Sequence, residues 1–202
     1  MLAVAGGKGG SGKTTTALGL AGALVERRRR PLLVDCDLDA PNLHLRAGVP
    51  RDPGLDAADP ATVVHEAETV PGADVLPVGD ADGDDLVAAL DALPGSRPVV
   101  LDCPAGASEA AVRPLRAADG CVVVATASRE GVEDAVKTAA MARAVGTPVF
   151  AVAVARARDV PRGLADATAA DTVPIPEAET PLLDSETAAA YAALADHAES
   201  VA

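Results

Sequence analysis

The sequence predicts an α/β fold: a doubly wound, mostly parallel β-sheet with helices on both faces. Short apolar segments alternate with helical segments along the chain, which is the pattern of parallel βαβ units. A glycine-rich stretch joins the first apolar segment to the first helix, and two later apolar segments run into aspartates. At 202 residues, the chain is expected to form one domain over residues 1–202 with a sizeable core.

Each element follows from local patterning. Buried strands are expected at residues 2–5, 31–37, 73–79, 120–126 and 148–154, and a further apolar run opens the segment 98–106. Helices are expected at residues 16–25, 86–93, 129–145 and 185–200, with a short helix at 61–68. An acidic loop leads into the helix at 86–93, and Ser185 is the expected N-cap of the last helix. Residues 46–71 carry no motif from which a role follows.

The stretch after the first strand fits G-x-x-x-x-G-K-[ST], the phosphate-binding loop. Strand, glycine loop and helix form the context in which backbone N–H groups and a helix N-terminus surround phosphate oxygens. Lys13 is expected to neutralise the β- and γ-phosphates, and the Thr14 hydroxyl to bind Mg²⁺. The loop residues expected to bind nucleotide are Gly7, Gly9, Gly10, Ser11, Gly12, Lys13, Thr14 and Thr15.

Carboxylates follow two of the other apolar runs. Asp35 and Asp37 end the run that starts at Pro31, and Asp102 ends the run that starts at Pro98. Ligands of open α/β sheets bind at the carboxyl edge, where such residues gather. Asp102 is therefore a candidate to hold Mg²⁺ through water. An aspartate-rich turn that caps local backbone is the structural alternative for Asp35 and Asp37.

Three motifs together resemble the MinD/ParA family of deviant Walker A P-loop ATPases. K-G-G-x-G-K-T-T resembles its loop, V-D-x-D-x-x-x-x-N its switch I and D-x-P-A-G its switch II. The resemblance implies that Lys8 crosses to the nucleotide of a partner subunit, that Asp37 activates water, and that Asp35 lies near the magnesium. It also implies ATP and Mg²⁺ as ligands and an ATP-dependent homodimer that positions a cellular structure in division, motility or chromosome placement.

The base-binding part departs from the family pattern. Relatives often have Asn-Arg after the strand at 148–154, where this chain has Ala155 and Arg156. The segment at 172–177 resembles a family segment that packs near the base, which makes Pro176 and Glu177 candidates for that contact. N-K-x-D, the guanine motif, does not occur in the sequence, so ATP is the favoured nucleotide.

The composition bears on the source of the protein, on DNA binding and on the state of its cysteines. The net charge is −13, and only three residues are lysine, which is typical of proteins from salt-loving archaea; an acidic protein from a GC-rich genome is the alternative. The charge argues against non-specific DNA binding. The cysteines are Cys36, Cys103 and Cys121, without C-x-x-C, and are expected to be small buried residues.

No apolar run is long enough to span a membrane, no signal peptide is recognised, and the C-terminal residues lack a basic amphipathic membrane-targeting helix. A cytoplasmic protein with an unidentified protein partner is expected. Three alternatives remain open: a DNA-partition ATPase of the ParA type, an iron–sulfur carrier of the Mrp type, and an adaptor that binds nucleotide without hydrolysing it.

Overall fold

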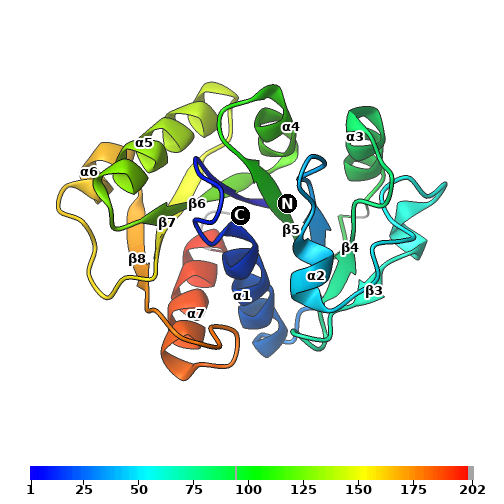
Figure 1. Cartoon of the computed structure of the whole chain (residues 1–202), viewed down its shortest axis with the longest axis horizontal. Helices are drawn as coiled ribbons and strands as arrows, with labels where there is room; N and C mark the ends of the chain where they lie inside the picture. The colour runs from blue at the N-terminus through cyan, green and yellow to red at the C-terminus, as the bar shows by residue number, and fades with distance from the viewer. Residues whose placement is uncertain (94, 200–202) are drawn as a thin grey trace.

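The computed structural model describes residues 1–93 and 95–199. An eight-stranded sheet runs through the molecule in the order β3-β4-β2-β5-β1-β6-β7-β8, in which β3 is antiparallel to β4 and the other pairs are parallel (Figure 1). The strands are β1 (Leu2–Gly6), β2 (Leu32–Asp35), β3 (His65–Glu66), β4 (Asp74–Leu76), β5 (Val99–Ala105), β6 (Gly120–Thr126), β7 (Val149–Ala155) and β8 (Asp171–Ile175).

Helices cover both faces of the sheet. They are α1 (Lys13–Glu26), α2 (Leu43–Ala47), the 3₁₀ helix η1 (Pro60–Thr62), α3 (Gly83–Ala92), α4 (Glu109–Ala117), α5 (Arg129–Ala144), α6 (Leu164–Thr168) and α7 (Ser185–Glu199). Two hydrophobic clusters fill the space between the sheet and the helices that cover it. One includes Leu18 of α1 and Leu194 of α7, and the other includes Leu86 of α3 and Leu115 of α4. The predicted doubly wound α/β fold is thus confirmed.

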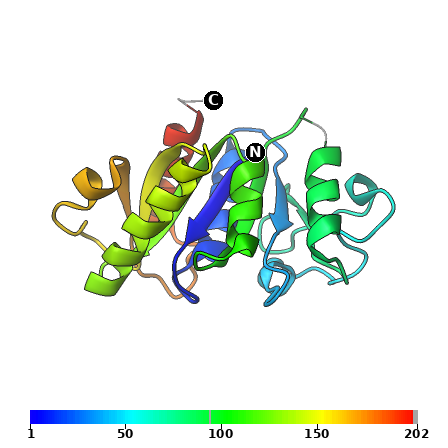
Figure 2. The ribbon, with the colours of Figure 1, turned by 90° about the horizontal axis from the view of Figure 1, so that it is seen from above.

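The parallel strands place their carboxyl ends at a common edge. Figure 2 shows β1 running toward the loop that precedes α1, with the N-terminus at the opposite edge. The core is built from Val, Leu and Ala side chains, since the chain contains one Phe, one Tyr and no Trp. None of the helices in residues 1–93 and 95–199 has the length and apolar character needed to cross a lipid bilayer.

Two local predictions were wrong. The stretch 61–68 does not form the expected helix: the end of the 3₁₀ helix η1 and the strand β3 occupy it, because His65 and Glu66 pair with β4 and the tertiary pairing overrides local helix preference. Ser185 does not cap the last helix. Asp184 does, since its Oδ1 accepts hydrogen bonds from the backbone N–H groups of Glu186 and Thr187.

Other boundaries differ from the prediction by a few residues. The acidic loop before α3 ends in a capping box, in which Asp82 and Asp85 exchange side chain to backbone hydrogen bonds, so the helix begins at Gly83 rather than at residue 86. The first helix begins at Lys13 rather than at 16. The sequence did not predict α4, which contains Pro114. Ser200 and the two residues after it, the end of the expected non-anchoring tail, lie outside the described residues.

Candidate nucleotide and magnesium site

Strand order brings the three predicted motifs to one place. β1 lies between β5 and β6, and β2 lies on the far side of β5. Asp35 of β2 is in register with Asp102 of β5, which in turn is opposite Val4 of β1. The glycine loop that follows β1 therefore lies beside both carboxylates at the carboxyl edge of the sheet, as expected for a ligand site of an open α/β fold.

The glycine loop has the backbone shape that its sequence predicts. Gly10 and Gly12 have φ angles of 74° and 103°, in the left-handed region that L side chains rarely adopt. Gly12 is followed at once by Lys13, the first residue of α1. The loop thus ends at the N-terminus of a 14-residue helix, where unpaired N–H groups and the helix dipole favour an anion.

Cationic and hydroxyl side chains line the inside of this loop. Lys13 is 8% exposed, and its Nζ donates a hydrogen bond to the backbone oxygen of Lys8 at 3.3 Å. The Thr14 hydroxyl donates to Asn42 Oδ1 at 2.9 Å, which connects the loop to the segment after β2. Ser11 Oγ is buried and has no hydrogen-bond partner in the part of the chain that the structure describes. These groups are available to a polyphosphate, since Lys13 and the loop N–H groups supply the charge that it requires.

A cavity of about 580 Å³ opens in front of the loop. Its lining combines the loop with residues of both acidic segments, and this size suits a nucleotide's phosphates and sugar. The lining includes Gly9, Gly10, Gly12, Lys13, Thr14, Thr15, Asp37, Asn42, Leu45, Arg46, Asp102 and Arg156. The structure thus brings together most of the residues that the sequence assigned to the phosphates.

Asp102 has the properties of a magnesium-site residue. Burial raises its pKa to about 7; the Thr14 hydroxyl and Lys13 oppose this rise, and the negative charge of Asp35 adds to it. Its Oδ1 is buried and has no hydrogen-bond partner within residues 1–93 and 95–199. A buried carboxylate oxygen without a partner costs free energy unless a cation or water reaches it. Together with the Thr14 hydroxyl it offers the oxygen ligands that Mg²⁺ prefers, so the residues present fit this ion.

Asp35 is fully buried and holds the segment after β2. Its Oδ1 accepts a hydrogen bond from the Asp37 N–H at 3.1 Å, and its Oδ2 accepts bonds from the N–H groups of Asn42 and Leu43 at 3.2 and 3.0 Å. Burial raises the pKa of Asp35 to about 6, against the effect of these hydrogen bonds. Both oxygens are thus committed to the backbone, which is a positioning role. The predicted place of Asp35 near the metal stays a prediction.

Asp37 and Lys8 differ in their surroundings. Asp37 lines the cavity, and its Oδ1 accepts a hydrogen bond from the Ala40 N–H at 3.1 Å. Lys8 is 55% exposed and pairs with Glu130, the second residue of α5, at 2.6 Å between Nζ and Oε2. This hydrogen bond and ion pair raise the pKa of Lys8 and lower that of Glu130. The exposed position leaves the Lys8 ammonium accessible to another molecule.

A second cavity of about 180 Å³ adjoins the first, and the two share Gly12, Thr15 and Arg156. Pro176 and Glu177 line it, so the structure places both predicted base-site candidates beside the glycine loop. Ala155 and Tyr191 also line it. The sequence did not indicate Tyr191, because its place depends on the packing of α7 against α1. The three cysteines are buried, as predicted.

Comparison with protein families and curated proteins gives consistent matches. The family model described as the CobQ/CobB/MinD/ParA nucleotide binding domain matches residues 2–166. An uncharacterized ATP-binding protein of Methanocaldococcus jannaschii is 30% identical over 169 residues, and the match covers 77% of this chain and 63% of that protein. A second uncharacterized ATP-binding protein of the same organism is 29% identical over 170 residues, with 77% and 64% covered.

Solved structures share the fold over nearly the full chain. The cell division ATPase MinD of Pyrococcus furiosus has a TM-score of 0.86 and 25% identity, covering 100% of this chain and 98% of that one. The septum site-determining protein MinD of Pyrococcus horikoshii OT3, complexed with Mg-ADP, has a TM-score of 0.84 and 25% identity, with 98% and 95% covered. MinD in the Aquifex aeolicus MinC:MinD complex has a TM-score of 0.81 at 19% identity, with 98% and 95% covered, and shows likeness of fold alone.

Proposed function

Because the chain belongs to the CobQ/CobB/MinD/ParA nucleotide-binding family, we propose that it is a slow ATPase whose residues 1–202 form one switch domain that dimerises when ATP is bound. The observation that carries the proposal is the 580 Å³ cavity, which places Lys13, Asp37 and Asp102 around one phosphate-binding loop. The Pyrococcus horikoshii relative is described with Mg-ADP, and the Methanocaldococcus relatives are named ATP-binding proteins.

The loop and α1 bind the nucleotide's phosphates. Backbone N–H groups of residues 9–15 surround the phosphate oxygens, and Lys13 exchanges its bond to the Lys8 carbonyl for the β- and γ-phosphates. Thr14 and Asp102 would hold Mg²⁺, which would supply positive charge to neutralise the phosphates. Pro176 and Glu177 contact the base in the smaller cavity.

Hydrolysis requires a water molecule aligned with the γ-phosphate. Asp37 lines the phosphate cavity and orients this water. Lys8, already exposed on the surface, leaves Glu130 and reaches the nucleotide of the second subunit, where it stabilises the charge that develops on the phosphates. ATP thereby becomes part of the subunit interface.

The hydrogen bond between Thr14 and Asn42 connects the nucleotide site to the exposed segment between Asp37 and α2. Binding at Thr14 competes with this bond, which fixes the segment between Asp37 and α2. The same segment carries Leu45, which is 72% exposed and lines the phosphate cavity. Formation of the dimer covers Leu45, and loss of the γ-phosphate releases the segment and opens the dimer.

In the cell, such a switch positions a division, motility or chromosome-related structure through a protein partner in the cytoplasm. The Pyrococcus furiosus relative is described as a cell division ATPase. The net charge of −13 disfavours the DNA-partition alternative because DNA binding needs a basic surface. The three buried thiols are compatible with a reducing compartment.

The test is solution mass and phosphate release with ATP, with ADP and without nucleotide, in molar salt. We expect an ATP-dependent dimer that Asp37→Ala stabilises by blocking hydrolysis and that Lys8→Ala abolishes. Lys137→Ala is the matched control, since Lys137 is a 72% exposed lysine that pairs with Asp134 on α5. Monomers in every state, without turnover, would refute the switch. A dimer without turnover would favour the non-hydrolysing adaptor, for which Ala155 in the base cavity is a supporting feature.

A further inference from the structure

Arg156 has a strained backbone at the carboxyl end of β7. Its φ angle is 55°, in the left-handed region that a non-glycine residue adopts at a free-energy cost. Its neighbours Ala155 and Ala157 are both buried, and the N–H of Ala157 donates to the Ile175 oxygen of β8 at 2.9 Å. The surrounding sheet therefore holds Arg156 in this conformation, and its side chain extends toward the glycine loop.

The guanidinium group binds that loop directly. Arg156 Nη2 donates a hydrogen bond to the backbone oxygen of Gly10 at 3.0 Å. The C=O and N–H groups of a trans peptide point in opposite directions, so fixing the Gly10 carbonyl also fixes the direction of the Ser11 N–H. Lys13 holds a second loop carbonyl, that of Lys8, at 3.3 Å. Two cations thus hold carbonyl oxygens of a loop whose N–H groups must be oriented to bind phosphate.

Arg156 also lies where the two cavities meet. It lines both the 580 Å³ cavity in front of the loop and the 180 Å³ cavity that contains Glu177. A guanidinium has five N–H donors, of which one bonds Gly10. Within residues 1–93 and 95–199, Arg156 makes no other side-chain hydrogen bond, so the remaining donors and the positive charge are available to an anionic ligand that extends from one cavity into the other.

We propose that Arg156 is a positioning residue for a nucleoside di- or triphosphate: it orients the phosphate loop before the nucleotide binds and places a fixed positive charge between the phosphate and base cavities. This inference rests on the nucleotide-binding part of the proposed function. It is independent of dimerisation and hydrolysis, because the hydrogen bonds from Arg156 to Gly10 and from Lys13 to Lys8 both lie within one chain.

The experiment compares Arg156→Ala, Arg156→Lys and Arg158→Ala with the wild type. Arg158 is the matched control because it lies two residues away, is 73% exposed and pairs with Glu186. Hydrogen exchange of the amides of residues 7–12 is measured on the nucleotide-free protein. Affinities for Mg-ADP and for inorganic tripolyphosphate, which has no base, are measured by calorimetry.

Arg156→Ala is expected to speed exchange of the loop amides and to weaken ADP and tripolyphosphate by about tenfold or more, the usual effect of losing a charge-assisted hydrogen bond. Arg156→Lys is expected to weaken ADP and tripolyphosphate binding less, since lysine keeps the positive charge but lacks the planar set of guanidinium donors. If the alanine variant does not fold, the lysine variant is the one that tests the role of Arg156. Arg158→Ala should match the wild type.

Unchanged loop exchange in Arg156→Ala would overturn the inference, even with weaker ADP binding, because the loop would then be ordered without Arg156. Equal tripolyphosphate affinities in the wild type and Arg156→Ala would overturn it as well. If the wild type binds no ADP while loop exchange still responds to Arg156→Ala, the nucleotide function fails and the orienting role of Arg156 stands.

Discussion

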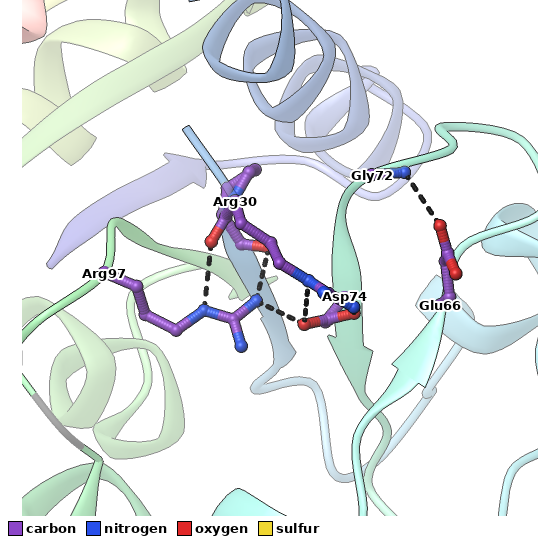
Figure 3. Close-up of polar contacts among 6 residues, drawn as sticks. Arg30, Glu66, Gly72, Asp74 and Arg97 are labelled. Atoms are coloured by element: carbon purple, nitrogen blue, oxygen red, sulfur yellow. Dashed lines mark hydrogen bonds and ion pairs between the residues drawn. The ribbon is translucent and has the colours of Figure 1, made fainter. Parts of the chain in front are cut away.

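Asp74 joins three neighbouring strands at the edge of the sheet opposite the nucleotide site (Figure 3). It is the first residue of β4, and its side chain is 5% exposed. Arg97, just before β5, donates to Asp74 Oδ2 at 2.7 Å and to the backbone oxygens of Arg30 and Pro31 at 3.0 and 2.9 Å. Arg30, just before β2, donates to both Asp74 oxygens at 3.1 Å.

We expect Asp74→Ala to lower the free energy of unfolding by about 2–3 kcal/mol, the range for hydrogen bonds to a charged group with little solvent access. Most of this loss belongs to the contact with Arg97, which is 22% exposed, because Arg30 is 68% exposed and solvent screens its charge. The assay is urea unfolding followed by circular dichroism, since the chain has no Trp.

Asp80→Ala is the control for Asp74→Ala. Asp80 also pairs with an arginine, Arg51, but at 3.5 Å and with 88% of its side chain exposed, so its removal should leave the free energy of unfolding nearly unchanged. The reasoning is refuted if the two variants are equally stable. A double-mutant cycle with Arg97→Ala then isolates the pair.

The contribution of Asp74 also has a defined pH dependence. Burial by itself would raise the pKa of Asp74, but hydrogen bonds from Arg30 and Arg97 outweigh it and lower the pKa below the ordinary value. A carboxyl whose folded pKa is lowered stabilises the protein above its unfolded pKa, near 4, and loses this effect as pH falls through the folded value. The stability difference between wild type and Asp74→Asn should therefore shrink below about pH 4.

Three further predictions concern the nucleotide site. Glu130→Gln removes the exposed ion pair that Lys8 forms within its own subunit. The ATP-dependent dimer, in which Lys8 contacts the nucleotide of the second subunit, should then strengthen about twofold to fivefold by sedimentation. A weaker dimer would contradict the idea that Glu130 and this nucleotide compete for Lys8. Leu45→Asp should abolish the dimer, whereas Val87→Asp on α3, 44% exposed, should have no effect on solution mass. Between about pH 4 and pH 7, the nucleotide-free wild type should lose roughly 2–4 kcal/mol of stability relative to Asp102→Asn, because the folded pKa of Asp102 is raised. Asp35, whose pKa is also raised, is present in both proteins and does not enter this difference. The measurement is chemical denaturation, and Mg²⁺ should no longer strengthen the ADP binding of Asp102→Asn; identical pH profiles of the two proteins would refute the account.

Local sequence patterns were sufficient to predict the layered fold and to name candidate residues for a phosphate site. The glycine loop depends on local backbone geometry, so Gly10 and Gly12 can be recognised from spacing alone, and both have left-handed φ angles in the structure. Asp102 follows from an apolar run that leads into a carboxylate, although β5 continues beyond Asp102 to Ala105. Both signals lie within a few consecutive residues, which is why the amino-acid sequence is enough to predict them.

The residues that meet across the chain, by contrast, depend on the tertiary arrangement. Lys8 pairs with Glu130 and Arg156 binds Gly10 because strands that are far apart in sequence place their carboxyl ends side by side. Asp35 shows the same limit within one segment: its carboxylate lies at a strand end, as predicted, but its burial and three backbone partners give it a positioning role. The sequence determines which chemical group each side chain carries. The contact partners of the side chain depend on strand order and packing, which no local pattern specifies.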